Sequence, residues 1–439
     1  MNYKKVCVIG LGYIGLPTAA TFAMHGVEVL GVDISPAIIE TLNKGEIHIH
    51  EPGLPEIFAQ AVQSGKFKAA LKPEEADAFI IAVPTPFKHN ETGEYKDIIY
   101  KLADMSAVAA AAESIVPYLR KGNIVILEST SPPRTTFDLI APILEKSSLK
   151  AGVDFHLCYS PERVLPGQIL RELIENSRVI GGVTPESAQA GADLYAIFVK
   201  GQITQTDATT AEMVKLMENT YRDVNIAIAN EFSRLADKFG VDIWEAIPIA
   251  NLHPRVKILS AGPGVGGHCI SVDPWFFVEA APELTPLIYH TRQVNDSQPQ
   301  FVVDVVKRSL GTLKGKKIAA LGLAYKPEVD DLRESPAVEV VQLLGREGAQ
   351  VLACEPFKPD ANLPNVTIAA TFDEAVRDAD ALILLVRHTE FTKLSPEETA
   401  KKTKARIIID TVNGWDAAQW QNAGFRFVKL GSGKEAGTF

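Results

Sequence analysis

A single thiol lies in a glycine-rich segment near the middle of the chain. Cys269 follows the run Gly264–Gly267 and precedes Asp273 by four residues. Glycine lets a backbone approach a ligand closely because it carries no Cβ atom. A thiol in such a loop is typical of a nucleophile, and an ordinary structural loop is the alternative. The other cysteines are Cys7, Cys158 and Cys354, and each lies in a short apolar run that predicts a buried strand. A thiol in such a strand usually only fills space in the core.

A second pattern predicts a dinucleotide site. Gly10, Gly12 and Gly15 form G-x-G-x-x-G where a predicted strand turns into a helix, so the phosphates face free helix amides. Asp33 lies 18 residues beyond Gly15, at the end of the next predicted strand, where a carboxylate binds the ribose diol. Residues 34–36 contain no arginine for a 2′-phosphate, so the pattern favours NAD over NADP.

A long helix is predicted from about Asp207 to Gly240, with Thr209 and Glu212 as its capping box. Polar residues spaced three, four and three apart share one face of this helix: Glu212, Lys215, Asn219 and Arg222. By itself such a stripe is more typical of a solvated surface than of a site. The predicted length of this helix is typical of a helix that connects two domains.

His48 and His50 alternate in a short segment, a pattern that raises the question of a metal. We expect them instead to be surface residues on an edge strand, and we predict no metal site.

The elements that position these residues alternate between strands and helices, which predicts a mostly parallel sheet with helices on both faces. We expect a helix over Ile98–Leu119 and further helices at Asp242–Ala250 and Leu284–Asn295. The expected strands of the first part are Val6–Ile9, Val29–Val32, Ala78–Ala82, Ile124–Leu127, Phe155–Cys158 and Val179–Ile180.

The chain also repeats itself, because Lys4–Tyr13 matches Lys316–Tyr325. The second copy has Ala324 in place of the middle glycine, so close approach of a pyrophosphate is less favourable there. It continues into a helix at Ala337–Gly345 and strands at Val351–Cys354, Ala381–Val386 and Ile407–Asp410. We predict two Rossmann-like, doubly wound α/β domains (1–206 and 313–439) joined by a helical middle domain (207–312), with disorder only from Gly431.

Composition excludes several classes of protein. The net charge of −10 over 439 residues argues against nucleic acid as the main partner. No apolar run approaches the length of about 20 residues that a bilayer span requires. The chain begins directly with a strand, so we expect no signal peptide. Four scattered cysteines form no disulfide framework, which indicates a cytoplasmic protein.

Seven motifs spread over nearly the whole chain follow one another in the order of a known family: Gly10–Gly15, Val83–Pro86, Glu128–Thr130, Ser160–Arg163, Ala211–Asn219, Gly264–Asp273 and Asp331–Pro336. By these motifs the chain resembles the UDP-sugar 6-dehydrogenases. The segments His253–Val256 and Asp273–Phe276 favour the branch that acts on UDP-N-acetyl-D-mannosamine over its N-acetylglucosamine relatives.

The resemblance implies a four-electron oxidation of C6 by two NAD+ in turn, with a thiol that captures the aldehyde. It makes Cys269 the nucleophile and Lys215 the group that stabilises the oxyanion. It assigns Asn219 to the C6 oxygen and Asp273 to water and proton transfer. Glu162 and Thr130 would position the hydrolytic water, with Glu162 as the base.

The same resemblance assigns the binding residues. The residues expected to bind NAD are Gly10, Gly12, Tyr13, Ile14, Gly15, Asp33, Thr85, Thr130 and Arg333. The residues expected to bind the nucleotide-sugar are Glu162, Arg163, Val164, Lys215, Asn219, Arg222, His253, Arg255, Gly264, Gly266 and Lys326. Arg255 would reach its substrate across a homodimer interface of the central helices. Pro166 replaces a second acid of the UDP-glucose enzymes, so the nicotinamide contact must be made differently or not made.

Other functions make different predictions. A UDP-N-acetylglucosamine or UDP-glucose 6-dehydrogenase would differ only in its preferred substrate. A two-electron alcohol dehydrogenase would yield one NADH per substrate instead of two. A non-enzymatic NAD sensor would bind NAD without turnover.

Overall fold

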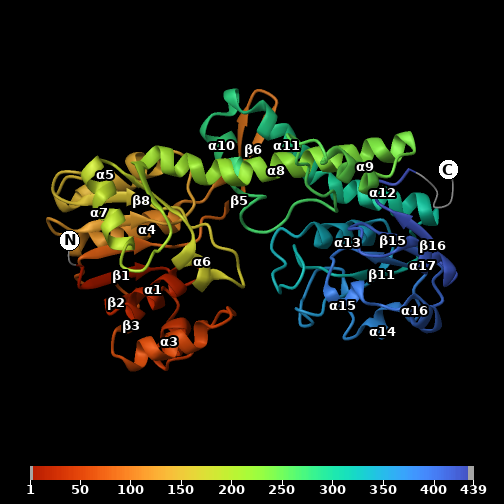
Figure 1. Cartoon of the computed structure of the whole chain (residues 1–439), viewed down its shortest axis with the longest axis horizontal. Coiled ribbons are helices and arrows are strands. Elements are labelled where there is room, and N and C mark those ends of the chain that lie inside the picture. The colour runs from red at the N-terminus through yellow and green to blue at the C-terminus, as the bar shows by residue number, and fades with distance from the viewer. Residues whose placement is uncertain (1–2, 434–439) are drawn as a thin grey trace. The chain divides into compact units, whose positions relative to one another are not determined.

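The computed structural model describes residues 3–433, which pack as two compact units (Figure 1). The first unit contains the described residues up to Glu218 and the segment Trp275–Glu283. The second contains Asn219–Pro274 and the described residues from Leu284 onwards. Each unit contains one large β-sheet, so the prediction of two Rossmann-like sheets with a long helix between them in sequence is confirmed.

The sheet of the first unit has the strand order β10-β9-β8-β7-β4-β1-β2-β3. Its strands are β1 (Lys5–Ile9), β2 (Glu28–Val32), β3 (Phe67–Ala70), β4 (Ala78–Ile81), β7 (Ile124–Leu127), β8 (His156–Tyr159), β9 (Arg178–Gly182) and β10 (Ile203–Asp207). The helices between them are α1 (Gly15–Met24), α2 (Pro36–Asn43), α3 (Leu54–Gln63), α4 (Ser106–Ile115), α5 (Ala141–Leu144), α6 (Ile169–Glu175) and α7 (Pro185–Tyr195), with short helical turns η1 (Val116–Tyr118), η2 (Thr136–Ile140) and η3 (Glu145–Ser147).

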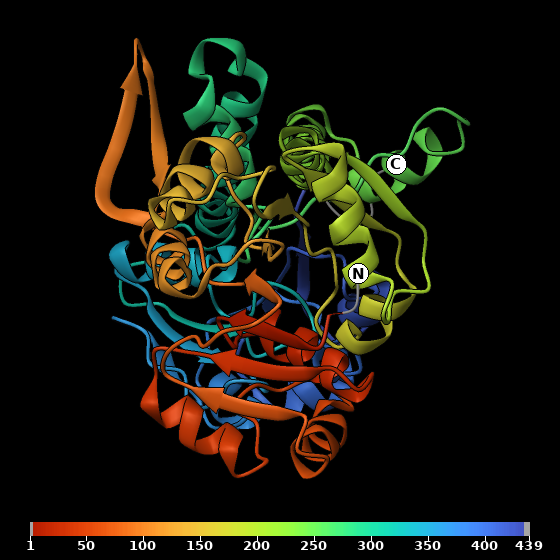
Figure 2. The same ribbon diagram turned by 90° about the vertical axis from the view of Figure 1, so that its left-hand side faces the viewer.

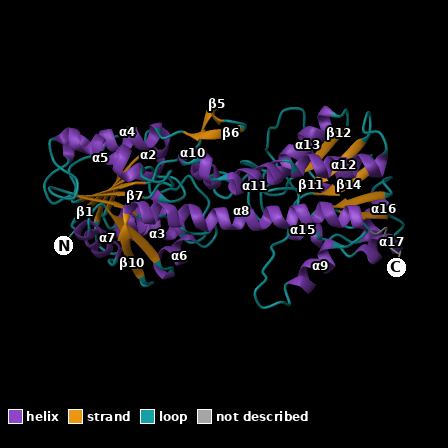
Figure 3. Cartoon of the chain, turned by 90° about the horizontal axis from the view of Figure 1, so that it is seen from above, coloured by secondary structure: helices purple, strands orange, loops and turns teal. Residues whose placement is uncertain are grey.

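Both faces of this sheet are apolar, as expected for parallel strands covered by helices. On β1, Val6 and Val8 pack into one core, whereas Cys7 and Ile9 pack into the other. Helices accordingly lie on both sides of the strands (Figure 3).

The end of this sheet reverses direction. Strand β9 pairs antiparallel with β8 and parallel with β10, whereas the pairs from β8 to β3 are all parallel. The first residue of β9, Arg178, therefore lies at the edge where β7 and β8 end. In open α/β sheets, that carboxyl edge is where ligands bind.

The helix predicted over Ile98–Leu119 is wrong in its first part. Strands β5 (Phe87–Tyr95) and β6 (Ile98–Ala103) form an antiparallel hairpin, drawn in orange in Figure 2, and α4 begins only at Ser106. The run Ile98–Ala103 contains β-branched and aromatic residues, which favour a strand over a helix.

The sheet of the second unit is entirely parallel, in the order β13-β12-β11-β14-β15-β16. Its strands are β11 (Lys317–Leu321), β12 (Gln350–Cys354), β13 (Thr367–Ile368), β14 (Ala381–Leu384), β15 (Ile407–Asp410) and β16 (Arg426–Lys429). The internal repeat is visible in detail. Asp77 before β4 accepts the backbone N–H of Lys5 at 2.9 Å, and Asp380 before β14 accepts that of Lys317 at 2.9 Å.

Helix α8 (Ala208–Phe239) is continuous over 32 residues, or roughly 48 Å at the usual rise per residue. The predicted capping box is wrong. Asp207 caps the helix by accepting the backbone N–H of Thr210 at 2.9 Å, whereas the Glu212 side chain binds a different loop.

The remaining helices are α9 (Ile243–Ala250), α10 (Asp273–Ala280), η4 (Pro282–Leu284), α11 (Pro286–Asp296), α12 (Gln298–Leu310), α13 (Pro336–Arg346), α14 (Phe372–Val376), α15 (Thr389–Thr392), α16 (Pro396–Lys402) and α17 (Ala417–Asn422). No helix within residues 3–433 is long and apolar enough to cross a membrane. The predicted disorder is wrong for residues 431–433, because Ile243 N–H donates to Gly431 O at 2.9 Å and Gly433 N–H to Val241 O at 3.0 Å. Residues 434–439 lie outside the described part of the chain.

Candidate active site

The glycine-rich turn after β1 has the geometry of a dinucleotide site. Gly10 has a φ of +92°, and a Cβ atom there would lie 2.5 Å from the carbonyl oxygen of Ala82. A Cβ on Gly15 would lie 1.8 Å from the carbonyl oxygen of Gly10, so α1 packs tightly on the turn. A Cβ on Gly12 would meet nothing within 4 Å. The space beside Gly12 is therefore left for a ligand, and NAD fits this turn. Tyr13 and Ile14 are half-buried at the start of α1.

Asp33 stands at the end of β2 with its carboxylate fixed. One oxygen accepts the N–H of Leu11 at 3.1 Å and the other that of Ser35 at 2.9 Å. A carboxylate oxygen has further lone pairs, so both can still accept ribose hydroxyls. The predicted edge strand at His48 and His50 is wrong, because both residues lie exposed in a loop.

The loops after β4 and β7 carry Thr85 and Thr130, both half-buried. Ser129 ties the two loops together by donating to the carbonyl oxygen of Val83 at 2.7 Å. Buried Glu212 fixes the rest of the second loop, since it accepts the N–H of Thr136 at 2.8 Å and its hydroxyl at 2.6 Å.

The loop after β8 carries Glu162, Arg163 and Val164. Glu162 accepts the N–H of Arg163 at 2.7 Å, and its other oxygen accepts from Arg178 at 2.5 Å. The Arg163 guanidinium binds Glu218 at 2.7 Å, and Val164 packs on the core. Sequence reasoning missed Arg178. The signal was a charged residue at the start of a strand that is otherwise apolar.

Lys215 lies on α8 and is only 7 % exposed. Within residues 3–433 its ammonium has no hydrogen bond or ion pair. A buried cation without a carboxylate partner is suited to stabilise negative charge that develops on a substrate. Lys215 belongs to the first unit, together with Glu162 and Thr130.

The second unit holds the thiol. Cys269 is half-buried, and its carbonyl oxygen accepts the N–H of Asp273 at 2.8 Å, which places the two residues on one helical turn. Asp273 in turn accepts a hydrogen bond from Asn219 at 2.6 Å. The other cysteines are fully buried in β1, β8 and β12 as predicted, and burial raises the pKa of Cys7 and Cys354 to about 12.

The glycines before Cys269 fit against the segment 325–336 of the same unit. A Cβ on Gly266 would lie 2.5 Å from the carbonyl oxygen of Glu334, and one on Gly267 would lie 2.8 Å from the Tyr325 ring. Gly264 has a φ of +143°, a conformation that favours glycine. Close packing of the two segments thus gives all three glycines a structural role.

His268, which sequence reasoning left without a role, lies in an ion cluster. Its Nδ1 is 3.2 Å from Arg333 and 3.7 Å from Asp331, and Arg333 also binds Asp331 at 2.6 Å. The nearby carboxylate of Asp331 raises the pKa of His268 to about 9. Burial favours the neutral acid, but the neighbouring His268 and the hydrogen bonds from Arg333 hold the pKa of Asp331 well below its usual range.

The other predicted substrate residues of the second unit are spread over its surface. Arg222, His253 and Arg255 are exposed, and the N–H of Arg255 donates to His253 at 3.3 Å. Lys326 is half-buried, with its ammonium 5.5 Å from the centroid of the Tyr325 ring. Within residues 3–433 no three His, Cys, Asp or Glu side chains are grouped as metal ligands.

In the second sheet Glu355 takes the place that Asp33 has in the first. It accepts the N–H groups of Leu323 at 2.6 Å and Ala324 at 2.9 Å, and lies 3.1 Å from Nε2 of buried His388. The N–H groups of Leu323 and Ala324 in this turn are therefore already bound to Glu355 and are not left for a pyrophosphate. This agrees with a second domain that binds a different nucleotide from the first.

Three comparisons identify the family. Models for the UDP-glucose/GDP-mannose dehydrogenase family match residues 4–199 (NAD binding domain), 209–297 (central domain) and 319–417 (UDP binding domain). A UDP-N-acetyl-D-mannosamine dehydrogenase of Methanocaldococcus jannaschii is 46% identical over 99% of this chain and 98% of the relative. An NDP-N-acetyl-D-galactosaminuronic acid dehydrogenase of Ralstonia solanacearum is also 46% identical, over 95% of this chain and 97% of the relative.

Among solved structures, a UDP-D-ManNAc dehydrogenase from Pyrococcus horikoshii has a TM-score of 0.89 at 39% identity, covering 98% of this chain and 99% of that one. The glycine turn, the fixed Asp33 and the matched domains agree with one another. The chain therefore belongs to the UDP-glucose/GDP-mannose dehydrogenase family and is an NAD-dependent nucleotide-sugar dehydrogenase.

Proposed function

We propose that this enzyme oxidises C6 of UDP-N-acetyl-D-mannosamine to the uronate, which would serve polysaccharide synthesis. The balanced reaction consumes one sugar alcohol, two NAD+ and one water, and yields the carboxylate, two NADH and three protons. The observation that carries the proposal is the half-buried Cys269 one helical turn from Asp273, whose carboxylate binds Asn219.

The turn Gly10–Gly15 would hold the pyrophosphate of NAD+ and Asp33 its ribose, and the bound cofactor would supply the hydride acceptor for both oxidations. Thr85, Thr130 and Arg333 are the further cofactor contacts in this proposal.

Cys269 supplies the step that makes the second oxidation possible. Its thiolate adds to the C6 aldehyde and forms a thiohemiacetal, and loss of hydride from that adduct leaves a thioester. Lys215 stabilises the oxyanion of the adduct, and Asn219 binds the C6 oxygen. Asp273 orders water and takes up a proton.

Hydrolysis of the thioester regenerates the thiol. Glu162 removes a proton from the attacking water, and Thr130 helps to place that water. The carboxylate of Glu162 suits this role because two donors fix it while lone pairs remain for a water molecule.

The nucleotide-sugar is assigned to Lys326, Arg222 and the loop with Gly264 and Gly266. Arg163 and Val164 follow the base, and His253 lies in the exposed loop with Arg255. We propose domain boundaries at 206/207 and 312/313.

The test is the NADH stoichiometry measured on a panel of UDP sugars. Two NADH per UDP-N-acetylmannosamine, with slower turnover of the N-acetylglucosamine and glucose compounds, is the expected result. UDP-N-acetylgalactosamine belongs in the panel, because the Ralstonia relative is as similar as the mannosamine enzyme. One NADH per sugar, or none, would rule out the four-electron reaction.

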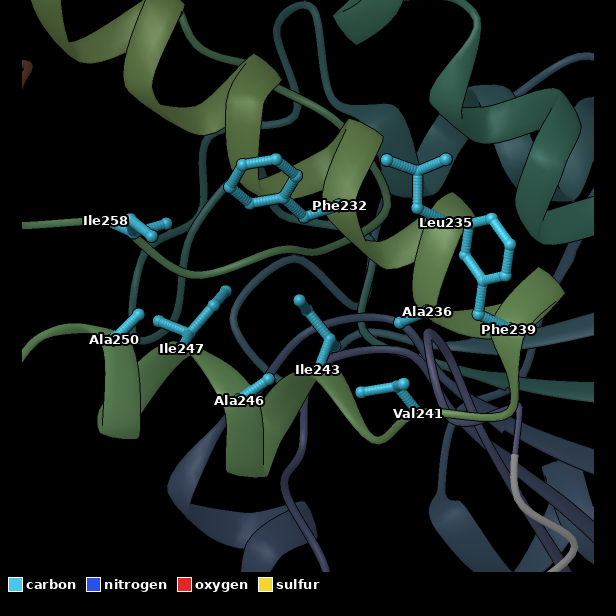
Figure 4. Close-up of a pocket in the computed structure, with 10 residues that line it drawn as sticks. All are labelled: Phe232, Leu235, Ala236, Phe239, Val241, Ile243, Ala246, Ile247, Ala250 and Ile258. Atoms are coloured by element: carbon cyan, nitrogen blue, oxygen red, sulfur yellow. The ribbon is translucent and has the colours of Figure 1, made fainter.

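We also propose a homodimer through α8 and α9. Exposed apolar residues follow one face of α8, with exposed fractions of 40–69%: Tyr221, Ile228, Phe232, Leu235 and Phe239. A pocket of about 250 Å³ lies beside this face. Figure 4 shows that α8 contributes Phe232 and Leu235 to it and that α9 contributes Ile243 and Ile247. A second copy of the same face is the simplest partner, since a two-fold interface is self-complementary. Arg255 would then contact substrate in the partner subunit.

A cytoplasmic location is part of the proposal. All four cysteines are free, which is usual for proteins of a reducing compartment.

A further inference from the structure

A buried charged cluster lies at the carboxyl edge of the first sheet. It joins Glu128 after β7, Glu162 after β8 and Arg178 at the start of the reversed strand β9. Their side chains are only 0%, 9% and 5% exposed, respectively. Charges are buried in proteins only where they are paired, so each member of this cluster depends on the others.

The guanidinium of Arg178 bridges the two carboxylates. Its Nη1 donates to Glu128 at 3.2 Å and to the Ser160 hydroxyl at 3.1 Å, and its Nη2 donates to Glu162 at 2.5 Å. The ring of Tyr195 lies 4.1 Å from the guanidinium carbon, and its hydroxyl donates to Glu128 at 2.5 Å. Glu128, Ser160 and the Tyr195 ring therefore hold the guanidinium in place. Only its Nη2 atom contacts Glu162, the proposed base.

The charges of the cluster do not sum to zero if both acids are ionised. Glu128 is the acid that holds the extra proton most easily, since burial raises its pKa to about 7 although Arg178 opposes the shift. One oxygen of Glu128 is buried and has no partner within residues 3–433, which is compatible with a proton there. Glu162 keeps the position nearer the solvent.

We propose that Arg178 is a positioning residue that fixes the Glu162 carboxylate for thioester hydrolysis, and that Glu128 and Tyr195 hold Arg178 in place. The inference rests on the proposed function of Glu162. Arg178 is only 5% exposed, so it would act through Glu162 rather than on the substrate itself. Because misplacement of a reacting group by about 1 Å costs roughly 100-fold in rate, loss of this bond should slow the one step that needs Glu162.

The experiment compares wild type with Arg178→Met, Arg178→Lys and Glu162→Gln by rapid mixing with NAD+ and UDP-N-acetylmannosamine. For Arg178→Met we expect a burst of two NADH per site followed by turnover slowed about 10- to 100-fold, with the thioester on Cys269 seen by intact mass. Because the thioester accumulates, KM should fall together with kcat, and kcat/KM for the sugar should change little. Arg178→Lys should recover part of the rate because an ammonium can still pair with Glu162.

The double variant Arg178→Met/Glu162→Gln decides between positioning and a separate structural role. We expect it to be no slower than Glu162→Gln alone. A double variant whose loss of turnover equals the product of the two single losses would overturn the inference. A slower NADH burst in Arg178→Met would do so as well. If Arg178→Met does not fold, Tyr195→Phe keeps every charge, and unchanged turnover in that variant would also overturn it. Failure of wild type to form two NADH would instead count against the proposed function.

Discussion

Asn219 donates a hydrogen bond to Asp273 over 2.6 Å, and the two residues are only 8% and 2% exposed, respectively. The bond fixes the carboxylate at the start of α10, one turn beyond the thiol of Cys269. We expect Asp273→Asn to lower kcat by at least 100-fold, because the amide cannot take up a proton. Circular dichroism should be unchanged. Asp304→Asn, on α12, is the control, and equal loss in both variants would contradict the assignment.

Cys269→Ala should abolish net uronate formation, because no other thiol can form the adduct. NAD binding, measured by calorimetry, should survive, since the cofactor turn lies elsewhere in the chain. Cys354→Ala is the matched control, and its turnover should stay within about two-fold of wild type. Full uronate formation by Cys269→Ala would refute the role of the thiol.

Alanine substitutions in the cofactor turn should affect NAD binding at Gly12 and the stability of the fold at Gly15. Gly12→Ala meets open space and should weaken NAD binding about 10-fold with little change in Tm, because the added methyl enters the pyrophosphate position. Gly15→Ala would place its Cβ 1.8 Å from a backbone oxygen and should lower Tm sharply. Calorimetry and thermal unfolding measure the two effects. Unchanged NAD affinity in Gly12→Ala would place the cofactor elsewhere.

Glu128 predicts a pH dependence of stability. Its pKa of about 7 in the folded state lies above its usual value of 4.5, so the folded chain holds a proton that the unfolded chain releases in this interval. Stability is therefore lost as the pH rises from about 4.5 to 7. Glu128→Gln removes this loss, and its advantage in Tm over wild type should grow from pH 5 to pH 8. An advantage that does not change with pH would contradict the shifted pKa.

The apolar face of α8 predicts the oligomeric state. Phe232→Glu and Leu235→Glu place a charge in the proposed interface and should convert a dimer into a monomer by light scattering. Val153→Glu is the control, since Val153 is 78% exposed on the first unit. A wild-type monomer, or dimers in all variants, would exclude this interface.

Much of the fold follows from local sequence patterns, and its failures have physical causes. The strand β1 and the helix α8 were predictable because apolar periodicity and the turn glycines agree. Strand β6 (Ile98–Ala103) was missed because it precedes helix α4 without a glycine or proline between them. The cap of α8 was misplaced because Glu212 fits a capping-box spacing but binds Thr136, which is distant in sequence.

The candidate site divides in the same way. Gly10–Gly15 and Asp33 could be found because their spacing is fixed by one βαβ unit. Arg178 gave only the signal of a charge at the start of an apolar strand, because its contacts with Glu128 and Glu162 arise from the direction of that strand, which no local pattern encodes.

That reversed pair of strands, β9 and β10, has a consequence for how such folds acquire precision. In an all-parallel sheet, the ligand edge receives residues only from strand ends and the loops beyond them, which are the parts most free to move. A strand that runs the other way delivers its opening residue to that edge while its backbone is already anchored in the ladder. Each strand that runs the other way thereby gives that edge a rigid support, and an enzyme designer can copy it by inverting a terminal strand rather than by stiffening a loop.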